Sequence, residues 1–310
     1  MTMTNTTPTT RRMRLGLAMD MDENGVTGHV TRFRDLQAQA QAAEQVGFDS
    51  LWIADHFIFR FPDRPEAGTW EMFAVISALA AVTARIQLGS FVACTAFRPP
   101  ALTAKIADTI DEISGGRFIL GLGAGWHEPE FTAFGYPFDH LAARFDEALQ
   151  IIAPLIREGH VDFHGQYYAV TDSALRPRGP SAGRIPIWIG ARRPRMLELT
   201  ARYADGFNTV WHLDPANAKA KYDELAADCQ KIGRDPGEIV RSAGTFVHIL
   251  EGDEQPKPDE KTIHGTAEEI AEKLRGFADA GTEHLVVVIE PAGLEGIGRF
   301  AKVIELLDKA

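Results

Sequence analysis

Eight runs of apolar residues, each about as long as a β-strand, alternate with stretches of helical periodicity along this 310-residue chain. The runs lie at 13–19, 48–54, 86–94, 117–123, 187–191, 206–211, 240–250 and 284–290. Strands that alternate with helices form a parallel sheet, and eight of them can close into a (β/α)8 TIM barrel. An open doubly wound sheet is the alternative. In both folds a ligand is expected at the carboxyl ends of the strands.

The length fits one barrel domain over residues 13–310, because α/β barrels of about 250 residues are common. After the second run we expect a loop and then a helix over 69–83, with Thr69 as its N-cap. Between 160 and 184 the alternation breaks, with hairpin character around Gly165, and we interpret this segment as an insertion after the fourth β/α unit. Residues 1–12 are polar and rich in threonine, which predicts a disordered tail or a true start at Met13.

The composition excludes several classes of partner. A net charge of -11 argues against binding to nucleic acids or anionic membranes, which require a basic face. No apolar run approaches the roughly 20 residues that span a bilayer, and the N-terminus lacks the apolar centre of a signal peptide. Two cysteines, Cys94 and Cys229, cannot form a disulfide framework, so we expect a cytoplasmic protein.

The ends of the apolar runs hold mostly glycine, aromatic and small polar residues. His56, His127 and His212 lack the spacing of metal ligands, so we expect no metal. A Gly-x-Ser-x-Gly motif, which would indicate a serine nucleophile, does not occur. A barrel mouth of this composition with one central histidine suits a flat organic cofactor.

A glycine motif ends the fourth run and is the first candidate for cofactor binding. Its residues are Gly121-Leu122-Gly123, followed by Ala124, Gly125 and Trp126. Glycine lets a backbone approach a ligand closely and adopt dihedral angles that other residues avoid. The alternative is that these glycines only allow close packing of the protein itself.

A basic segment after the fifth run is the second candidate. Six arginines and no acidic residue lie between 173 and 197. Gly190, Ala191, Arg192 and Arg193 precede Pro194, which suits the first turn of a helix. Free backbone N–H groups at a helix start bind anions, so this turn predicts a phosphate site. A solvated basic rim is the alternative.

Five ordered stretches, at 47–56, 88–100, 111–138, 186–208 and 264–287, resemble the bacterial luciferase-like monooxygenase family. Within that family they are most similar to the branch that uses the deazaflavin coenzyme F420. The resemblance implies a barrel, a flavin or deazaflavin across its mouth and a homodimer.

The resemblance also implies roles for individual residues. Asp55 and His56 match an aspartate-histidine pair beside the reactive ring, where the histidine donates a proton or stabilises the cofactor. A histidine can exchange protons at physiological pH, although His56 could instead only bond a neighbouring loop. Phe91 and Val92 match a bulged strand with a cis peptide that backs the ring. The turns at 123–126 and 190–193 match contacts to the side chain and phosphate of the cofactor.

Two positions depart from the deazaflavin-dependent sugar-phosphate dehydrogenases of this family. Trp126 stands where those enzymes have a carboxylate, and Arg60 stands where they have a tryptophan. The sequence therefore does not support that activity. His127 and Glu128 could take the acid role, although Glu128 could equally cap the following helix.

These observations predict an oxidoreductase that transfers a hydride between coenzyme F420 and a small organic substrate. One alternative is a two-component monooxygenase that uses FMN and a partner flavin reductase. Others are a non-catalytic flavin-binding barrel and a metal-dependent hydrolase. The arginine-rich segment favours the longer, polyanionic tail of F420.

Overall fold

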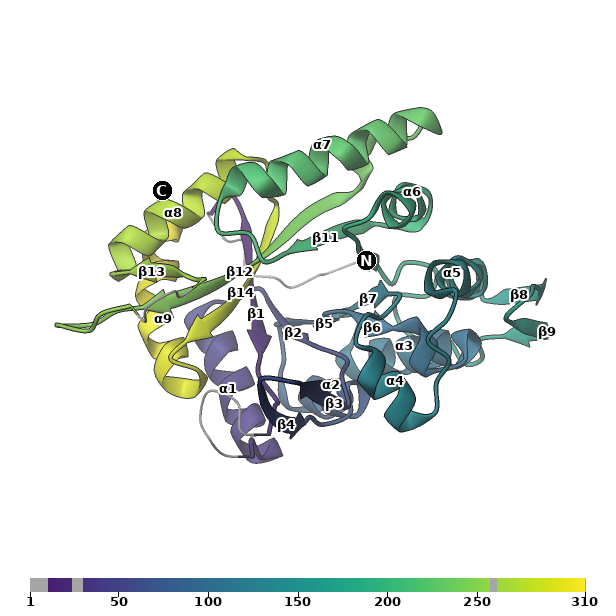
Figure 1. The fold of residues 1–310 in the computed structure, drawn as a ribbon, viewed down its shortest axis with the longest axis horizontal. Helices are drawn as coiled ribbons and strands as arrows, with labels where there is room; N and C mark the ends of the chain where they lie inside the picture. The colour runs from purple at the N-terminus through teal and green to yellow at the C-terminus, as the bar shows by residue number, and fades with distance from the viewer. Residues whose placement is uncertain (1–10, 24–29, 257–260, 310) are drawn as a thin grey trace.

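The computed structural model describes residues 11–23, 30–256 and 261–309, and its centre is a closed barrel. Among the described residues, eight parallel strands form the barrel in the order β1, β2, β5, β7, β10, β11, β12 and β14, and β14 pairs back with β1. Figure 1 shows the helices around these strands. The predicted (β/α)8 TIM barrel is confirmed.

The barrel strands follow the apolar runs of the sequence. They are β1 (Arg14–Met19), β2 (Ser50–Ile53), β5 (Gln87–Ser90), β7 (Phe118–Gly123), β10 (Ile187–Gly190), β11 (Gly206–Val210), β12 (Val240–Ile249) and β14 (His284–Glu290). The helices are α1 (Phe33–Val46), α2 (Met72–Val82), α3 (Pro100–Ser114), α4 (Glu128–Phe134), α5 (Leu141–Glu158), α6 (Pro194–Tyr203), α7 (Pro215–Lys231), α8 (Ala267–Asp279) and α9 (Gly293–Asp308). No described helix has the length and apolar character needed to cross a membrane.

Two tryptophans fill the interior of the barrel. The rings of Trp52 and Trp188 lie 5.0 Å apart and are almost fully buried. A side chain at Gly16 or Gly89 would overlap the indole of Trp52, and one at Gly206 would overlap that of Trp188. Glycine is needed on these strands because no other residue leaves space for the two indoles.

A β-hairpin lies where the sequence predicts a loop. Its strands are β3 (Ile58–Phe61) and β4 (Arg64–Gly68), which pair antiparallel directly after β2. The next helix, α2, begins at Met72 rather than near Thr69, because the carboxylate of Glu71 accepts a hydrogen bond from the N–H of Ala74, at 2.6 Å, and serves as the N-cap.

The segment around Gly165 forms the expected hairpin. Its strands, β8 (His160–His164) and β9 (Ala169–Ala174), lie between α5 and β10. The carboxylate of Glu147 accepts hydrogen bonds from three successive N–H groups of its tip, at 166–168. That this segment is an insertion stays a prediction.

The N-terminal boundary differs from the expected tail at 1–12. Residues 1–10 lie outside the described residues, but Arg11 is part of the fold. Its guanidinium donates to Asp49, at 2.8 Å, and to Asp308, at 2.9 Å. Four short elements complete the described structure: β6 (Ala93–Cys94) pairs with β7, β13 (Ile263–Gly265) pairs with β12, and η1 (Thr95–Phe97) precedes α3. The fourth, the 3-10 turn η2 (Pro236–Glu238), precedes β12.

Candidate functional site

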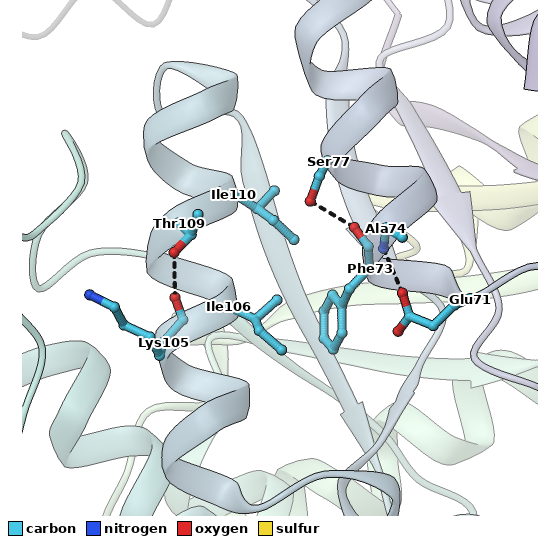
Figure 2. Close-up of a pocket in the computed structure, with 8 residues that line it drawn as sticks. All are labelled: Glu71, Phe73, Ala74, Ser77, Lys105, Ile106, Thr109 and Ile110. Atoms are coloured by element: carbon cyan, nitrogen blue, oxygen red, sulfur yellow. Dashed lines mark hydrogen bonds between the residues drawn. The ribbon is translucent and has the colours of Figure 1, made fainter.

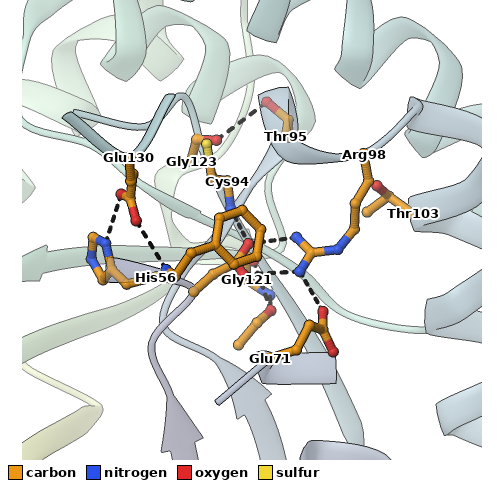
Figure 3. Close-up of polar contacts among 12 residues, drawn as sticks. His56, Glu71, Cys94, Thr95, Arg98, Thr103, Gly121, Gly123 and Glu130 are labelled. Atoms are coloured by element: carbon orange, nitrogen blue, oxygen red, sulfur yellow. Dashed lines mark hydrogen bonds and ion pairs between the residues drawn. The ribbon is translucent and has the colours of Figure 1, made fainter. Parts of the chain in front are cut away.

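His56 lies just beyond β2 and is held by a carboxylate from α4. Its Nδ1 lies 2.8 Å from Oε1 of Glu130, whose other oxygen accepts a hydrogen bond from the N–H of Phe57 at 3.0 Å. Figure 3 shows these contacts. The Glu130 side chain is only 2% exposed and that of His56 is 17% exposed. Because Nδ1 is engaged by the carboxylate, Nε2 is the ring nitrogen left to exchange a proton.

Aromatic rings surround His56 on the mouth side. The ring of Phe59 lies 4.5 Å from that of His56, and the indole of Trp126 meets it edge-on at 5.6 Å. Trp126 itself is 59% exposed. The ends of β2 and β7 thus place the predicted residues His56 and Trp126 together.

Neither of the two residues proposed for the acid role takes the position beside Nδ1 of His56, which Glu130 occupies. Glu128 is exposed, and the N-cap of α4 is His127 rather than Glu128. His127 is buried, and its Nε2 accepts a hydrogen bond from the N–H of Arg60 at 3.1 Å. Burial lowers the pKa of His127, which keeps the ring neutral. The sequence missed Glu130, because two glutamates two residues apart look equivalent until the helix is oriented against β2.

Asp55 is buried and is engaged by the half-buried Arg98. Its carboxylate accepts two hydrogen bonds from Arg98, at 2.7 and 3.0 Å, and one from the N–H of Cys94 at 2.9 Å. Arg98 also donates to Glu71, at 2.5 Å, at the start of α2. Figure 3 shows Arg98 with its guanidinium toward Glu71. These contacts indicate that Asp55 positions the end of β2. They do not favour a catalytic role for Asp55, which stays a prediction.

The expected cis peptide between Phe91 and Val92 is confirmed. The Val92 side chain occupies the space that a Cβ would need at Gly123 on β7 and at Gly190 on β10, and a Cβ at Gly121 would overlap the carbonyl of Ser90. The contacts therefore support the packing explanation for these glycines.

The last glycine of the motif, Gly125, also has a packing explanation. It has a φ of +87°, and a Cβ there would lie 2.5 Å from the Phe131 ring and 2.7 Å from Sγ of Cys94. Ala124, beside it, is half-buried and packs against the main core. Ligand contacts at Ala124 and at the glycines stay a prediction.

The rim of β10 offers donors for an anion. Arg193 is the N-cap of α6 and Pro194 is its first residue, while the N–H of Ala191 donates to Asn208. Among the described residues, the N–H groups of Arg192 and Arg193 have no backbone partner, and both side chains are exposed. Two N–H groups and two guanidinium groups at the start of a helix suit a phosphate.

The six arginines between 173 and 197 predict a positively charged surface, but carboxylates that the fold brings close to two of them reduce this charge. Arg195 pairs with Asp146 of α5 at 2.6 Å and with Glu198 at 3.0 Å. Arg178 lies 3.5 Å from the carboxylate of Asp108 on α3. Carboxylates from other elements thus offset two of the six charges, which the local sequence cannot show.

A ring directly after β11 and a ring on β12 add an aromatic wall. Trp211 stacks on Phe246, with ring centres 4.3 Å apart, and meets Phe91 edge-on at 5.9 Å. Phe91, Val92 and the donors of Arg192 and Arg193 are the residues that could hold a flat ring with an anionic tail. No group of histidine, cysteine and carboxylate side chains in the described part of the chain could hold a metal ion.

A further acid lies close to His56. Burial and the neighbouring Asp20 raise the pKa of Asp22, after β1, to about 6, while the charges of His56 and Arg64 oppose this rise. The N–H of Asp22 donates to the Asp20 carboxylate at 2.9 Å. The sequence places Asp20 at a strand end but gives no indication of Asp22.

The comparisons with known proteins agree with this architecture. The family described as luciferase-like monooxygenase matches the chain over residues 5–257. The F420-dependent glucose-6-phosphate dehydrogenase of Amycolatopsis mediterranei is 37% identical over 56% of this chain and 52% of that enzyme, so the match spans about half its length. The pyrimidine monooxygenase RutA of Klebsiella pneumoniae is 31% identical over 96% of this chain and 87% of its own.

A solved structure is similar over nearly the whole chain. It is an F420-dependent secondary alcohol dehydrogenase in complex with an F420-acetone adduct, with a TM-score of 0.80 and 21% identity, covering 95% of this chain and 99% of that one. At this identity the likeness establishes the fold, and the match over 5–257 establishes the family. The chain belongs to the luciferase-like monooxygenase family.

Proposed function

We propose that this protein is an oxidoreductase that transfers a hydride between coenzyme F420 and a small organic substrate. The observation that carries this proposal is the His56–Glu130 pair, in which the carboxylate engages Nδ1 and leaves Nε2 as the ring nitrogen for proton exchange. A relative that is 37% identical carries F420 dependence in its name. When bound, the deazaflavin supplies or takes up the hydride, and the protein must manage the accompanying proton.

Five of the predicted site residues, together with Glu130, have a place in this function. His56 exchanges the proton through Nε2, and Glu130 keeps its ring oriented. Phe91 and Val92 form the bed beneath the ring of the cofactor. Arg192 and Arg193 hold the anionic tail together with the N–H groups at the start of α6.

Dependence on FMN is the second candidate, because the pyrimidine monooxygenase RutA matches 96% of this chain. A monooxygenase of that kind would receive reduced flavin from a partner reductase. The two exposed arginines fit either phosphate-bearing cofactor, and the polyanionic tail of F420 can occupy more donors than the single phosphate of FMN.

Separate thermal titrations with F420 and FMN test the assignment. A ligand present at 100 times its dissociation constant stabilises the folded state by about 2.7 kcal/mol, which raises the melting temperature measurably. We expect the larger shift with F420. A shift with FMN alone would assign the monooxygenase chemistry instead, and no shift with either would overturn the proposal. Turnover that survives His56→Ala while cofactor binds would indicate a non-catalytic role for the histidine.

We also propose a homodimer formed through the groove between α2 and α3. This groove, of about 400 Å³, is lined by Phe73, Ala74, Ile106 and Ile110, with Glu71 and Lys105 on its two sides (Figure 2). Glu71 is already engaged by Arg98 and by the N–H of Ala74, so the contact between two copies depends mainly on the apolar lining of the groove. Light scattering tests this proposal. We expect the wild type to be a dimer and the Ala74→Arg variant to be a monomer. A monomeric wild type would refute it.

We propose a cytoplasmic location because both cysteines are free thiols. Cys94 and Cys229 are buried and free, which suits the reducing cytoplasm. Fractionation of cells that express the full chain tests this location.

A further inference from the structure

We infer that Trp126 and the β3–β4 hairpin form the substrate-binding surface, and that this surface selects a flat, uncharged, aromatic or conjugated molecule. The inference rests on the proposed function, because it places the substrate beside His56. Trp126 then contacts the substrate, whereas the sequence assigns it to the cofactor.

The rings of the hairpin extend the aromatic surroundings of His56 outward. Phe59 lies against His56, and Phe61 stacks with Trp126 at 6.3 Å with an angle of 29° between the ring planes. Among the large apolar side chains described as exposed, Trp126 is the most exposed, at 59%. An indole that remains this exposed next to a candidate catalytic histidine offers a π face to a bound molecule.

The hairpin is fixed in place before any substrate arrives. The N–H of Arg60 donates to the buried His127, and the N–H of Glu23 donates to the carbonyl of Gly68 at 2.7 Å. Arg60 also pairs with Glu66 across the two strands. A surface held at both strands loses little conformational freedom on binding, so its stacking contacts contribute fully to affinity.

The charges around this surface largely offset one another. The Arg64 guanidinium lies 3.9 Å above the ring of Phe61, and the charges of Arg64 and His56 both act on Asp22. Asp20 lies next to Asp22, Glu130 is engaged by His56, and Arg60 is neutralised by Glu66. Because acidic and basic groups are both present, neither an anionic nor a cationic substrate is attracted by the surface as a whole. The aromatic rings therefore determine which substrate is preferred.

The preference for π systems can be measured without a redox cofactor. Acetophenone and cyclohexyl methyl ketone share a skeleton and are both uncharged, but only acetophenone has an aromatic ring. We expect calorimetric titration of the cofactor-free protein to give about five-fold tighter binding of acetophenone, since aromatic pairs contribute about 0.5–1.5 kcal/mol beyond their buried area. An anionic analogue, 3-acetylbenzoate, is expected to bind no more tightly than acetophenone.

Two variants and one control locate the effect. Trp126→Ala and Phe61→Leu should each remove the preference for acetophenone, and Phe61→Leu retains most of the apolar volume if Trp126→Ala folds poorly. Trp70→Ala is the control, because Trp70 is also exposed, at 46%, but its indole donates to the carbonyl of Thr31 outside this surface. Equal affinity for the two ketones, stronger binding of 3-acetylbenzoate, or equal losses in Trp70→Ala and Trp126→Ala would overturn the inference. Because no cofactor is present, a failed F420 titration would leave these results interpretable.

Discussion

Oε1 of Glu130 lies 2.8 Å from Nδ1 of His56, so a buried carboxylate on α4 orients the ring that follows β2. Glu130 acts through the histidine, because both of its oxygens are engaged by His56 and by the N–H of Phe57. It is therefore a positioning residue whose loss should affect turnover more than binding.

The substitution Glu130→Gln tests this relationship. Loss of the carboxylate charge should weaken control of the His56 ring and lower kcat by about 10- to 100-fold, at or below the lower end of the roughly 100- to 10,000-fold that positioned acid–base groups contribute. The affinity for F420 and the KM for substrate should change little, and the pH profile of kcat should move. Glu128→Gln is the matched control, because Glu128 is exposed on the same helix. A larger loss in the control would contradict the assignment.

The ion pairs of Arg98 predict a large effect on stability. Arg98→Gln leaves the carboxylate of Asp55 buried without its bidentate partner, and breaking a buried pair in this way costs about 3–5 kcal/mol. Arg12→Gln removes an exposed pair with Asp279 and should cost less than about 1 kcal/mol. Urea denaturation of both variants measures the difference. Equal unfolding free energies would show that Asp55 does not depend on Arg98.

The histidine at the base of the barrel predicts sensitivity to acid. Burial lowers the pKa of His284 from 6.5 to about 3, and its Nε2 lies 2.8 Å from Oγ of Ser50. A lowered histidine pKa means that the unfolded chain binds the extra proton. The contribution of neutral, buried His284 to the free energy of unfolding is therefore complete above pH 6.5. It is lost, at about 1.4 kcal/mol per pH unit, as the pH falls toward 3. Urea melts across this range should show the slope, and His284→Gln should flatten it, whereas exposed His160→Gln should not.

Asp22 predicts the opposite dependence on pH. Its pKa rises from 3.8 to about 6 on folding, so the folded state holds the proton more tightly. The favourable contribution of protonated Asp22 to the free energy of unfolding is present below pH 3.8 and is lost as the pH rises through 6. Asp22→Asn should therefore be more stable than the wild type above pH 6 by about 1 kcal/mol, after allowance for solvent screening of a partly exposed group. Denaturation at pH 5 and pH 8 checks the sign, with exposed Asp63→Asn as the control.

The anion site predicts a loss of cofactor affinity. Replacing Arg193 or Arg192 with glutamine should weaken F420 binding about ten-fold or more, since a hydrogen bond to a charged group contributes about 1.5–3 kcal/mol. Arg195→Gln should have a small effect, because Asp146 and Glu198 already engage that side chain. Fluorescence titration with F420 measures all three. Equal affinities for all variants would place the anion elsewhere.

The sequence predicts the barrel because each strand is a local pattern of apolar residues, and the boundaries at β7 and β14 agree closely with the expected runs. The site is harder to predict because its contacts are long-range. Glu130 could be distinguished from Glu128 only after α4 is packed against the end of β2. Likewise, the neutralisation of Arg195 depends on Asp146, 49 residues earlier in the chain. The β3–β4 hairpin was missed because β3 has only four residues and β4 is a short segment with a proline and two charged residues, so neither shows a clear strand pattern.

The two indoles inside the barrel and the glycines that face them restrict how this chain can evolve. A larger residue at Gly16, Gly89 or Gly206 overlaps Trp52 or Trp188, and a smaller residue in place of either indole leaves a void. Single substitutions on either side are therefore unfavourable, and tolerated changes must occur as correlated pairs. Inherited variation should accumulate instead in the loops above the strands, where new substrate preferences can arise without disturbing the scaffold.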